Sequence, residues 1–226
     1  MTKTDFQRRE FADGEELAQG LADWTAERLR EGVAARGVGL IVVSGGKSPA
    51  RFFDLLSNLD RDWTRVAITL ADERRVADDS PRSNARLVRE RLLSNRAKAA
   101  SFTPLADVRL PEDQELAAAS ARIAHLPMPA DVVILGMGDD GHTASWFPGA
   151  EGLAEAMDPA ARQLVAPMVA ADAPEPRLTL TGRVILRARA IALVSCATSP
   201  APEQGGGPPG AAHDPQAESL PPPPAE

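Results

Sequence analysis

Short apolar runs alternate with segments of helical periodicity along this chain, and no other feature constrains its fold as strongly. The runs predict strands over residues 40–43, 66–70, 101–104, 132–135, 177–181 and 191–196. Periodicity and capping residues predict helices over residues 15–36, 49–56 and 112–125, a helical turn over 183–187, and a helix that begins after an N-cap at Ser83 or Asn84. Strands that alternate with helices form right-handed crossovers and a mostly parallel sheet, covered on both faces. The sequence therefore predicts an α/β fold whose functional loops gather at the carboxyl ends of the strands.

The composition excludes several classes of function. A chain of 226 residues with a formal net charge of −7 can bury a sizeable core but has no basic stripe for nucleic acid. No apolar run approaches the length of a membrane span, and the N-terminus lacks the apolar region of a signal peptide. The single cysteine, Cys196, lies in an apolar run and is expected to be a core residue in a reducing compartment. We therefore expect a cytoplasmic protein that binds a small molecule, with no nucleic-acid or membrane partner.

The composition changes sharply after Ala197. Residues 198–226 are rich in proline, glycine and alanine and have almost no apolar side chains that could form a core. We expect this tail to be disordered and the catalytic domain to occupy residues 1–197. His213 lies in the tail and is assigned no role.

The loop after the first predicted strand has the composition of an anion-binding turn. It reads Ser44-Gly45-Gly46-Lys47-Ser48 and leads directly into a helix. Glycines let the backbone approach an anion closely, and the helix N-terminus adds amide donors beside the lysine charge. The spacing is neither a Walker loop nor GxGxxG, and a tight turn explains the glycines equally well.

A charged segment follows the strand over residues 66–70. Its carboxylates Asp72 and Glu73 are candidates for binding sugar hydroxyls or water, and Arg74 for holding a phosphate or polarising a carbonyl. The alternative is a solvated cluster of charges, which is the usual role of such a run.

The strand over residues 132–135 ends in glycines, then in Asp139, Asp140 and, after Gly141, His142. Histidine has an ordinary pKa of roughly 6.5, which suits a general base near neutral pH. Asp140 is a candidate to orient the imidazole or to contact the substrate, although the sequence leaves open which aspartate is the partner. The spacing of this loop is not that of a zinc site, and Ser145 lacks the GxSxG pattern of a serine hydrolase. A simple turn capped by the histidine is the alternative.

These three loops are expected to share one sheet edge. An anion-binding loop, an arginine-bearing acidic loop and a histidine loop together indicate hydrolysis or isomerisation of a phosphorylated small molecule.

Four segments extend this interpretation through a resemblance. SGGKSP, DERRV with the downstream SNARLVRERLL, GMGDDGHTASWFPG and PRLTLT, in this order and spacing, resemble the family of bacterial 6-phosphogluconolactonases, which shares its fold with glucosamine-6-phosphate deaminase and isomerase. The resemblance covers about Phe6 to Ala197. The deaminases carry Asn-Glu-Pro after Asp-Gly-His, whereas this chain carries Ser145-Trp146-Phe147-Pro148, which favours the lactonases. The resemblance implies a three-layer α/β/α, Rossmann-like, mostly parallel sheet of the glucosamine-6-phosphate deaminase/ribose-5-phosphate isomerase type.

The resemblance also implies a reaction. The family hydrolyses 6-phospho-D-glucono-1,5-lactone to 6-phospho-D-gluconate in the oxidative pentose phosphate pathway, without a metal or an organic cofactor. By position, His142 would deprotonate water and later protonate the leaving ring oxygen, while Asp140 would orient the histidine or the sugar. Arg74 would stabilise the oxyanion or bind substrate, and the Ser44–Ser48 loop with Arg177 would hold the 6-phosphate.

The resemblance ends near residue 197. Members of the family continue with a glycine-containing turn and a lysine, a helix and a terminal strand, whereas this sequence continues with Thr198-Ser199-Pro200 and a tail without lysine. We therefore expect a phosphate-side cation and one covering helix to be missing. A sugar-phosphate isomerase or deaminase of the same fold, and a catalytically weakened sugar-phosphate-binding protein, are the alternative functions. The expected assembly is a monomer or a homodimer.

Overall fold

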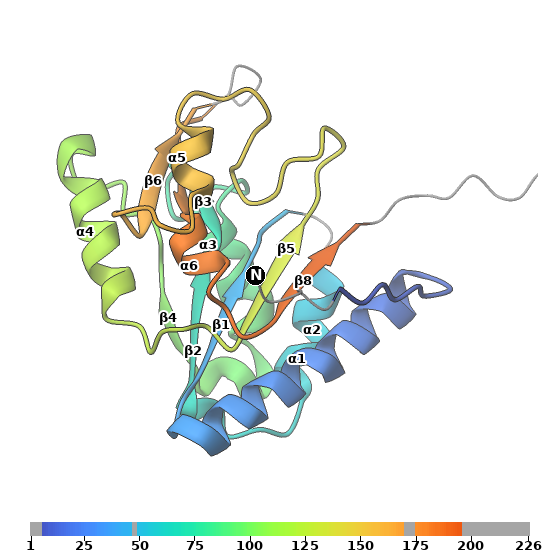
Figure 1. Ribbon diagram of the computed structural model, residues 1–226. Helices are drawn as coiled ribbons and strands as arrows, with labels where there is room; N and C mark the ends of the chain where they lie inside the picture. The colour runs from blue at the N-terminus through green and yellow to red at the C-terminus, as the bar shows by residue number, and fades with distance from the viewer. Residues whose placement is uncertain (1–5, 47–48, 170–174, 196–226) are drawn as a thin grey trace, which may run out of the picture. The chain divides into compact units, whose positions relative to one another are not determined.

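Five of the predicted strands form one parallel sheet in the computed structural model, in the order β4-β2-β1-β5-β8 (Figure 1). These strands are β1 (Gly39–Val43), β2 (Val66–Leu70), β4 (Ser101–Thr103), β5 (Val132–Gly136) and β8 (Ile191–Val194). Each neighbouring pair is parallel. All residues of β1 and β2 are buried, which explains why both strands appear in the sequence as unbroken apolar runs.

The structure describes residues 6–46, 49–169 and 175–195. The predictions made for Lys47, Ser48, Cys196 and the tail over residues 198–226 lie outside this range. The described residues fall within one compact unit, Met1–Cys196. In this part of the chain no helix combines the length and the hydrophobicity that crossing a bilayer requires.

Helices cover both faces of the sheet, as the alternation of elements predicts. The α-helices are α1 (Gly14–Arg36), α2 (Ala50–Asn58), α3 (Asn84–Leu87), α4 (Glu112–Ala124), α5 (Leu153–Met157) and α6 (Gly182–Ile185). Shorter helical segments lie at η1 (Trp63–Arg65), η2 (Val88–Leu92) and η3 (Asn95–Ala99). Figure 1 shows α1 and α2 on one side of the sheet and α4, α5 and α6 on the other. The three-layer α/β/α architecture with a mostly parallel sheet is therefore confirmed.

The capping residues set the ends of the longest helix. The side chain of Asp13 accepts hydrogen bonds of 2.9 Å from the backbone N–H groups of Glu15 and Glu16, which begin α1. Gly37 ends the helix with a left-handed φ of 80°, and its N–H donates to the carbonyl of Val33. These contacts place the turn into β1 directly after the helix.

A second, antiparallel sheet was not predicted. Its order is β3-β7-β6, formed by β3 (Asp72–Arg74), β7 (Arg177–Leu180) and β6 (Val165–Met168). The sequence analysis places Asp72–Arg74 in a loop, and this prediction is wrong. Three charged residues carry no strand pattern of their own, and they become a strand because β7 pairs with them.

The last strand of the main sheet is more exposed than its apolar sequence predicts. Ile191 and Leu193 expose 40% and 54% of their surface, although they lie in register with the buried Val133 and Leu135 of β5. Neighbours in register on parallel strands present their side chains to the same face. The elements that bury Val133 and Leu135 on this face of the sheet therefore do not extend over Ile191 and Leu193 of β8.

Candidate active site

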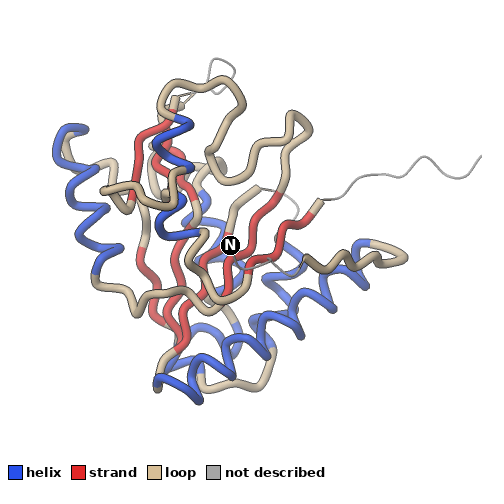
Figure 2. Tube along the Cα trace, in the orientation of Figure 1, coloured by secondary structure: helices blue, strands red, loops and turns tan. Residues whose placement is uncertain are grey.

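The main sheet has a topological switch point between β1 and β5. From β1 the chain passes through α2 to β2 on one side, whereas β5 lies on the other side of β1. Ligands of open α/β sheets bind beyond the carboxyl ends of the strands at such a point. Residues 44–46 and 137–147 follow these two strands, and the N–H of Ser44 donates to the carbonyl of Ile134 at 3.0 Å. Figure 2 shows the long loop after β5 at this edge of the sheet.

The loop after β5 pairs His142 with Asp140 rather than with Asp139. The imidazole Nδ1 lies 2.5 Å from Asp140 Oδ1, and the backbone N–H of His142 donates to the same oxygen at 3.2 Å. The hydrogen bond from the imidazole is the main cause that lowers the pKa of Asp140. A carboxylate accepts only when Nδ1 carries the proton, so Nε2 is left as the proton acceptor of the ring.

A glycine makes room for this pair. A Cβ on Gly138 would overlap the imidazole of His142, so this position tolerates no larger side chain without moving the ring. The side chain of His142 keeps 30% of its surface exposed, so solvent reaches the histidine.

The turn after His142 is held by buried side chains. Ala144 adopts a left-handed φ of 49°, an uncommon conformation for a residue with a Cβ. The fully buried Ser145 donates from Oγ to Asp72 Oδ2 at 2.6 Å, and Trp146 donates from Nε1 to the carbonyl of Leu180 at 3.2 Å. These bonds connect the histidine loop to the second sheet, whose strands are distant from the loop in the sequence.

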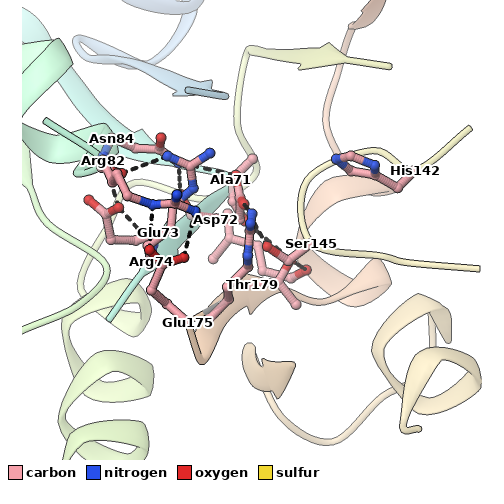
Figure 3. A network of polar contacts seen from close by, with 12 residues as sticks. Ala71, Asp72, Glu73, Arg74, Arg82, Asn84, His142, Ser145, Glu175 and Thr179 are labelled. Atoms are coloured by element: carbon pink, nitrogen blue, oxygen red, sulfur yellow. Dashed lines mark hydrogen bonds and ion pairs between the residues drawn. The ribbon is translucent and has the colours of Figure 1, made fainter. Parts of the chain in front are cut away.

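Asp72 is a buried residue that connects several elements around the candidate site. Only 5% of its surface is exposed, and its Oδ2 already accepts from Ser145 and lies 3.8 Å from Arg177 Nη1. Asn84 donates from Nδ2 to the backbone carbonyl of Asp72 at 2.9 Å. A Cβ on Gly45 would in turn overlap the side chain of Asn84. Asp72 therefore connects the histidine loop, β7 and α3 (Figure 3). Through Asn84 it also lies close to the glycine turn after β1.

Glu73 caps α3, and its binding of substrate stays a prediction. It is only 3% exposed, and its carboxylate accepts from the backbone N–H groups of Arg74, Asn84 and Ala85 at 2.7–2.8 Å. Ser83 Oγ is a further donor at 3.2 Å. A carboxylate that accepts from the first N–H groups of α3 caps that helix, and burial raises its pKa.

Two arginines lie side by side at the edge of the second sheet. Arg74 of β3 and Arg177 of β7 are partners in the antiparallel register. Burial, followed by the positive charge of Arg74, lowers the pKa of Arg177. Arg74 donates from Nη1 to the carbonyl of Arg82 at 2.6 Å, which fixes the direction of its guanidinium. Two adjacent cations, one of them largely desolvated, form a site that attracts an anion.

Several polar atoms around these loops are buried and have no hydrogen-bond partner among the described residues. They are Ser44 Oγ, Arg74 Nε, Thr143 Oγ1 and Arg177 Nε. Buried donors without partners are uncommon in folded proteins and are satisfied by water or ligand at binding sites. The sequence analysis names Ser44, Arg74 and Arg177 but omits Thr143. Only its place directly after His142 could have drawn attention to it.

Figure 3 shows His142 to one side of the network around Asp72, and no hydrogen bond joins the two. The ring of Phe147 links them instead. Its centroid lies 4.6 Å from the centroid of the imidazole and 5.0 Å from Cζ of Arg177. Sequence reasoning missed Phe147 because a phenylalanine carries no acid–base or ligand chemistry.

Comparison with known proteins identifies the family. The family model described as glucosamine-6-phosphate isomerases/6-phosphogluconolactonase matches residues 12–201. The chain belongs to this family. The resemblance seen in the sequence is thereby confirmed.

Named relatives within the family are close. A 6-phosphogluconolactonase of Mesorhizobium japonicum is 49% identical over 183 residues, which cover 81% of this chain and 77% of the relative. One of Pseudomonas aeruginosa is 45% identical, over 77% of this chain and 73% of the relative. The crystal structure of a 6-phosphogluconolactonase from Shewanella baltica matches with a TM-score of 0.78 and 44% identity, over 81% of this chain and 78% of that one.

Three or more histidine, cysteine, aspartate or glutamate side chains that could hold one ion would form a candidate metal site. The described part of the chain has no such group. The site is built instead from one histidine–carboxylate pair, two arginines and unpartnered hydroxyl and guanidinium groups.

Proposed function

We propose that the chain hydrolyses 6-phospho-D-glucono-1,5-lactone to 6-phospho-D-gluconate, with His142 as the general base. The family and the named relatives support this reaction. The observation that carries the role of His142 is its 2.5 Å contact from Nδ1 to Asp140 at the switch point of the sheet. This contact orients the ring and directs proton transfer to Nε2.

The arginines and hydroxyl groups provide the complementary anion site. In the proposed complex, Arg177 and the turn that begins at Ser44 bind the 6-phosphate, and Arg74 stabilises the oxyanion that forms at the carbonyl. The unpartnered buried Nε atoms of both arginines and Oγ of Ser44 support this assignment. Lactone hydrolysis needs a base, a stabiliser of negative charge and a place for the phosphate, but no nucleophilic side chain.

The proposed reaction has two steps. As the oxygen of water bonds to the lactone carbonyl carbon, one of its protons passes to Nε2 of His142. When the tetrahedral oxyanion collapses, the bond from that carbon to the ring oxygen breaks. The proton on Nε2 then passes to the ring oxygen, which leaves as the C5 hydroxyl, and the product acid ionises at neutral pH.

The test is an assay of lactone disappearance, with the spontaneous hydrolysis subtracted. We expect His142→Ala to lower kcat by about 10²–10⁴-fold, the usual contribution of a general base. His125→Ala is the matched control, because this histidine is exposed and its Nδ1 contacts only the carbonyl of Ala121 at 2.7 Å. Full activity of His142→Ala would refute the role of the base. Deamination of glucosamine 6-phosphate by the unmodified protein would overturn the choice of substrate.

The cytoplasmic location, the monomeric or homodimeric state and the domain boundary near residue 197 stay predictions.

A further inference from the structure

A single aromatic ring lies against both halves of the candidate site. The ring of Phe147 is tilted by 38° against the imidazole of His142, at 4.6 Å between centroids. Cζ of Arg177 lies over the same ring at 5.0 Å from its centroid. The imidazole and the guanidinium therefore cannot be further apart than the sum of these two distances. This limit places the two groups near enough for one small substrate to lie against both.

The backbone that carries this ring is anchored on both sides. Before Phe147, the buried indole of Trp146 donates to Leu180, and Ser145 donates to Asp72. After it, the N–H of Ala150 donates to the carbonyl of Phe147 at 3.1 Å. Because Leu180 and Asp72 belong to other elements, the position of the ring is set by the fold and not by its two contacts alone.

The two contacts differ in chemistry, and an aromatic ring serves both. The ring face attracts the guanidinium of Arg177, a cation whose burial already removes part of its hydration. The ring packs on the imidazole as one aromatic group on another. An aliphatic side chain of similar volume would fill the space but would supply neither interaction.

We propose that Phe147 is a positioning residue that holds His142 and Arg177 in one fixed arrangement, so that both act on the same substrate molecule. The inference rests on the proposed function, since it assigns Arg177 to the 6-phosphate and His142 to the water. Phe147 itself takes no part in proton transfer.

The test compares Phe147→Leu with Phe147→Tyr on two substrates, 6-phosphogluconolactone and the unphosphorylated glucono-1,5-lactone. For the phosphorylated lactone we expect Phe147→Leu to lower kcat/KM by about 10²-fold, through a lower kcat and a higher KM, because small misplacements of reacting groups have effects of this size. For the unphosphorylated lactone only kcat should fall, since no phosphate is present for Arg177 to bind. Phe147→Tyr keeps an aromatic ring, so its kcat and KM should stay near the values of the unmodified protein.

The chain offers a matched control. Phe102 of β4 carries a second cation–aromatic contact among the described residues, with Arg89 at 5.4 Å, and it lies at an edge of the main sheet. Phe102→Leu should leave kcat and KM unchanged. Kinetics of Phe147→Leu equal to those of the unmodified protein would overturn the proposal. So would an equal loss of kcat on both substrates, with KM unchanged and no rescue by tyrosine.

A spectroscopic readout separates this proposal from the proposed function and from a folding defect. In NMR spectra, the ring of Phe147 should shift the carbon-bound protons of the His142 imidazole. Phe147→Met fills much of the same space with a flexible side chain that has no aromatic ring. It should remove that shift while the backbone amide resonances stay dispersed. Imidazole shifts that are the same in Phe147→Met and in the unmodified protein would overturn the positioning role, whatever the lactonase assay gives.

Discussion

At the scale of single residues, the site depends on which aspartate bonds to the imidazole of His142. Asp139 and Asp140 are equal in the sequence, and only the fold of the loop places Asp140 within 2.5 Å of the imidazole. Gly138 permits this approach because a Cβ there would overlap the ring. The carboxylate of Asp140 thereby fixes which nitrogen of the ring accepts a proton.

The two aspartates form a matched pair for mutation. We expect Asp140→Asn to lower kcat by about 10²-fold, which is at the lower end of the contribution of a general base, because the amide no longer enforces the proton on Nδ1. Asp139→Asn should leave kcat within experimental error, since Asp139 is exposed and the imidazole bonds to Asp140. Steady-state kinetics on the phosphorylated lactone measure both. Equal effects of the two substitutions would contradict the assignment.

At the scale of elements, β3 supplies both Arg74, which we propose binds an anion, and Glu73, which caps a helix. Alternate residues of a strand point to opposite faces, so Glu73 turns away from Asp72 and Arg74 and reaches the first turn of α3. The same three residues thus build the site and hold the helix beside it. This arrangement explains why a short charged segment is a buried strand.

Replacing the cap should weaken the fold in a pH-dependent way. Glu73→Gln places an amide N–H₂ where a backbone N–H also donates, so we expect the free energy of unfolding to fall by about 1–3 kcal/mol. Burial raises the pKa of Glu73 above its ordinary value of 4.5, so the folded state binds the proton more tightly than the unfolded state. As the pH rises above 4.5, the contribution of Glu73 to the free energy of unfolding therefore falls in the unmodified protein, and the glutamine variant lacks this dependence.

Urea unfolding between acidic and neutral pH measures this difference. The stability gap between the unmodified protein and Glu73→Gln should be largest at acidic pH and narrow toward neutral pH. Glu90→Gln is the control, because Glu90 is exposed and pairs only with Arg86 one turn away, a contact worth about 0.5 kcal/mol at most. A gap that widens with rising pH would contradict the raised pKa.

At the scale of the whole molecule, two large apolar side chains of β8 are not buried in the core. Ile191 and Leu193 stay exposed although their neighbours in register on β5 are buried. A sheet with helices on both faces normally buries such residues. The stability of the domain is therefore open to improvement at this edge.

A chimaera tests this expectation. Replacing residues 198–226 with a family-like segment that carries a lysine, a helix and a strand should raise the Tm by about 5 °C, because it covers apolar side chains of β8. The added lysine should also lower KM for the phosphorylated lactone. A glycine–serine segment of equal length is the control for calorimetry and kinetics. An unchanged melting curve together with an unchanged KM would refute this prediction.

The sequence by itself determined the elements of local origin. Apolar runs and caps predicted β1, β2, β5, α1 and α4 within a few residues, because burial and capping leave a pattern at short range. The glycine turn after β1 and the Asp-Gly-His loop after β5 were likewise located, since parallel strands carry their functional loops at one edge.

Only the tertiary structure decided how those loops are joined. The pairing of Arg74 with Arg177, the burial of Asp72 under Ser145 and the capping of α3 by Glu73 all connect residues from different elements. Such contacts depend on strand register and on the side chains that other elements bring near, and neither leaves a periodic trace in the sequence. The local sequence therefore predicted His142 as a candidate residue, and packing between the two sheets decided which residues surround it.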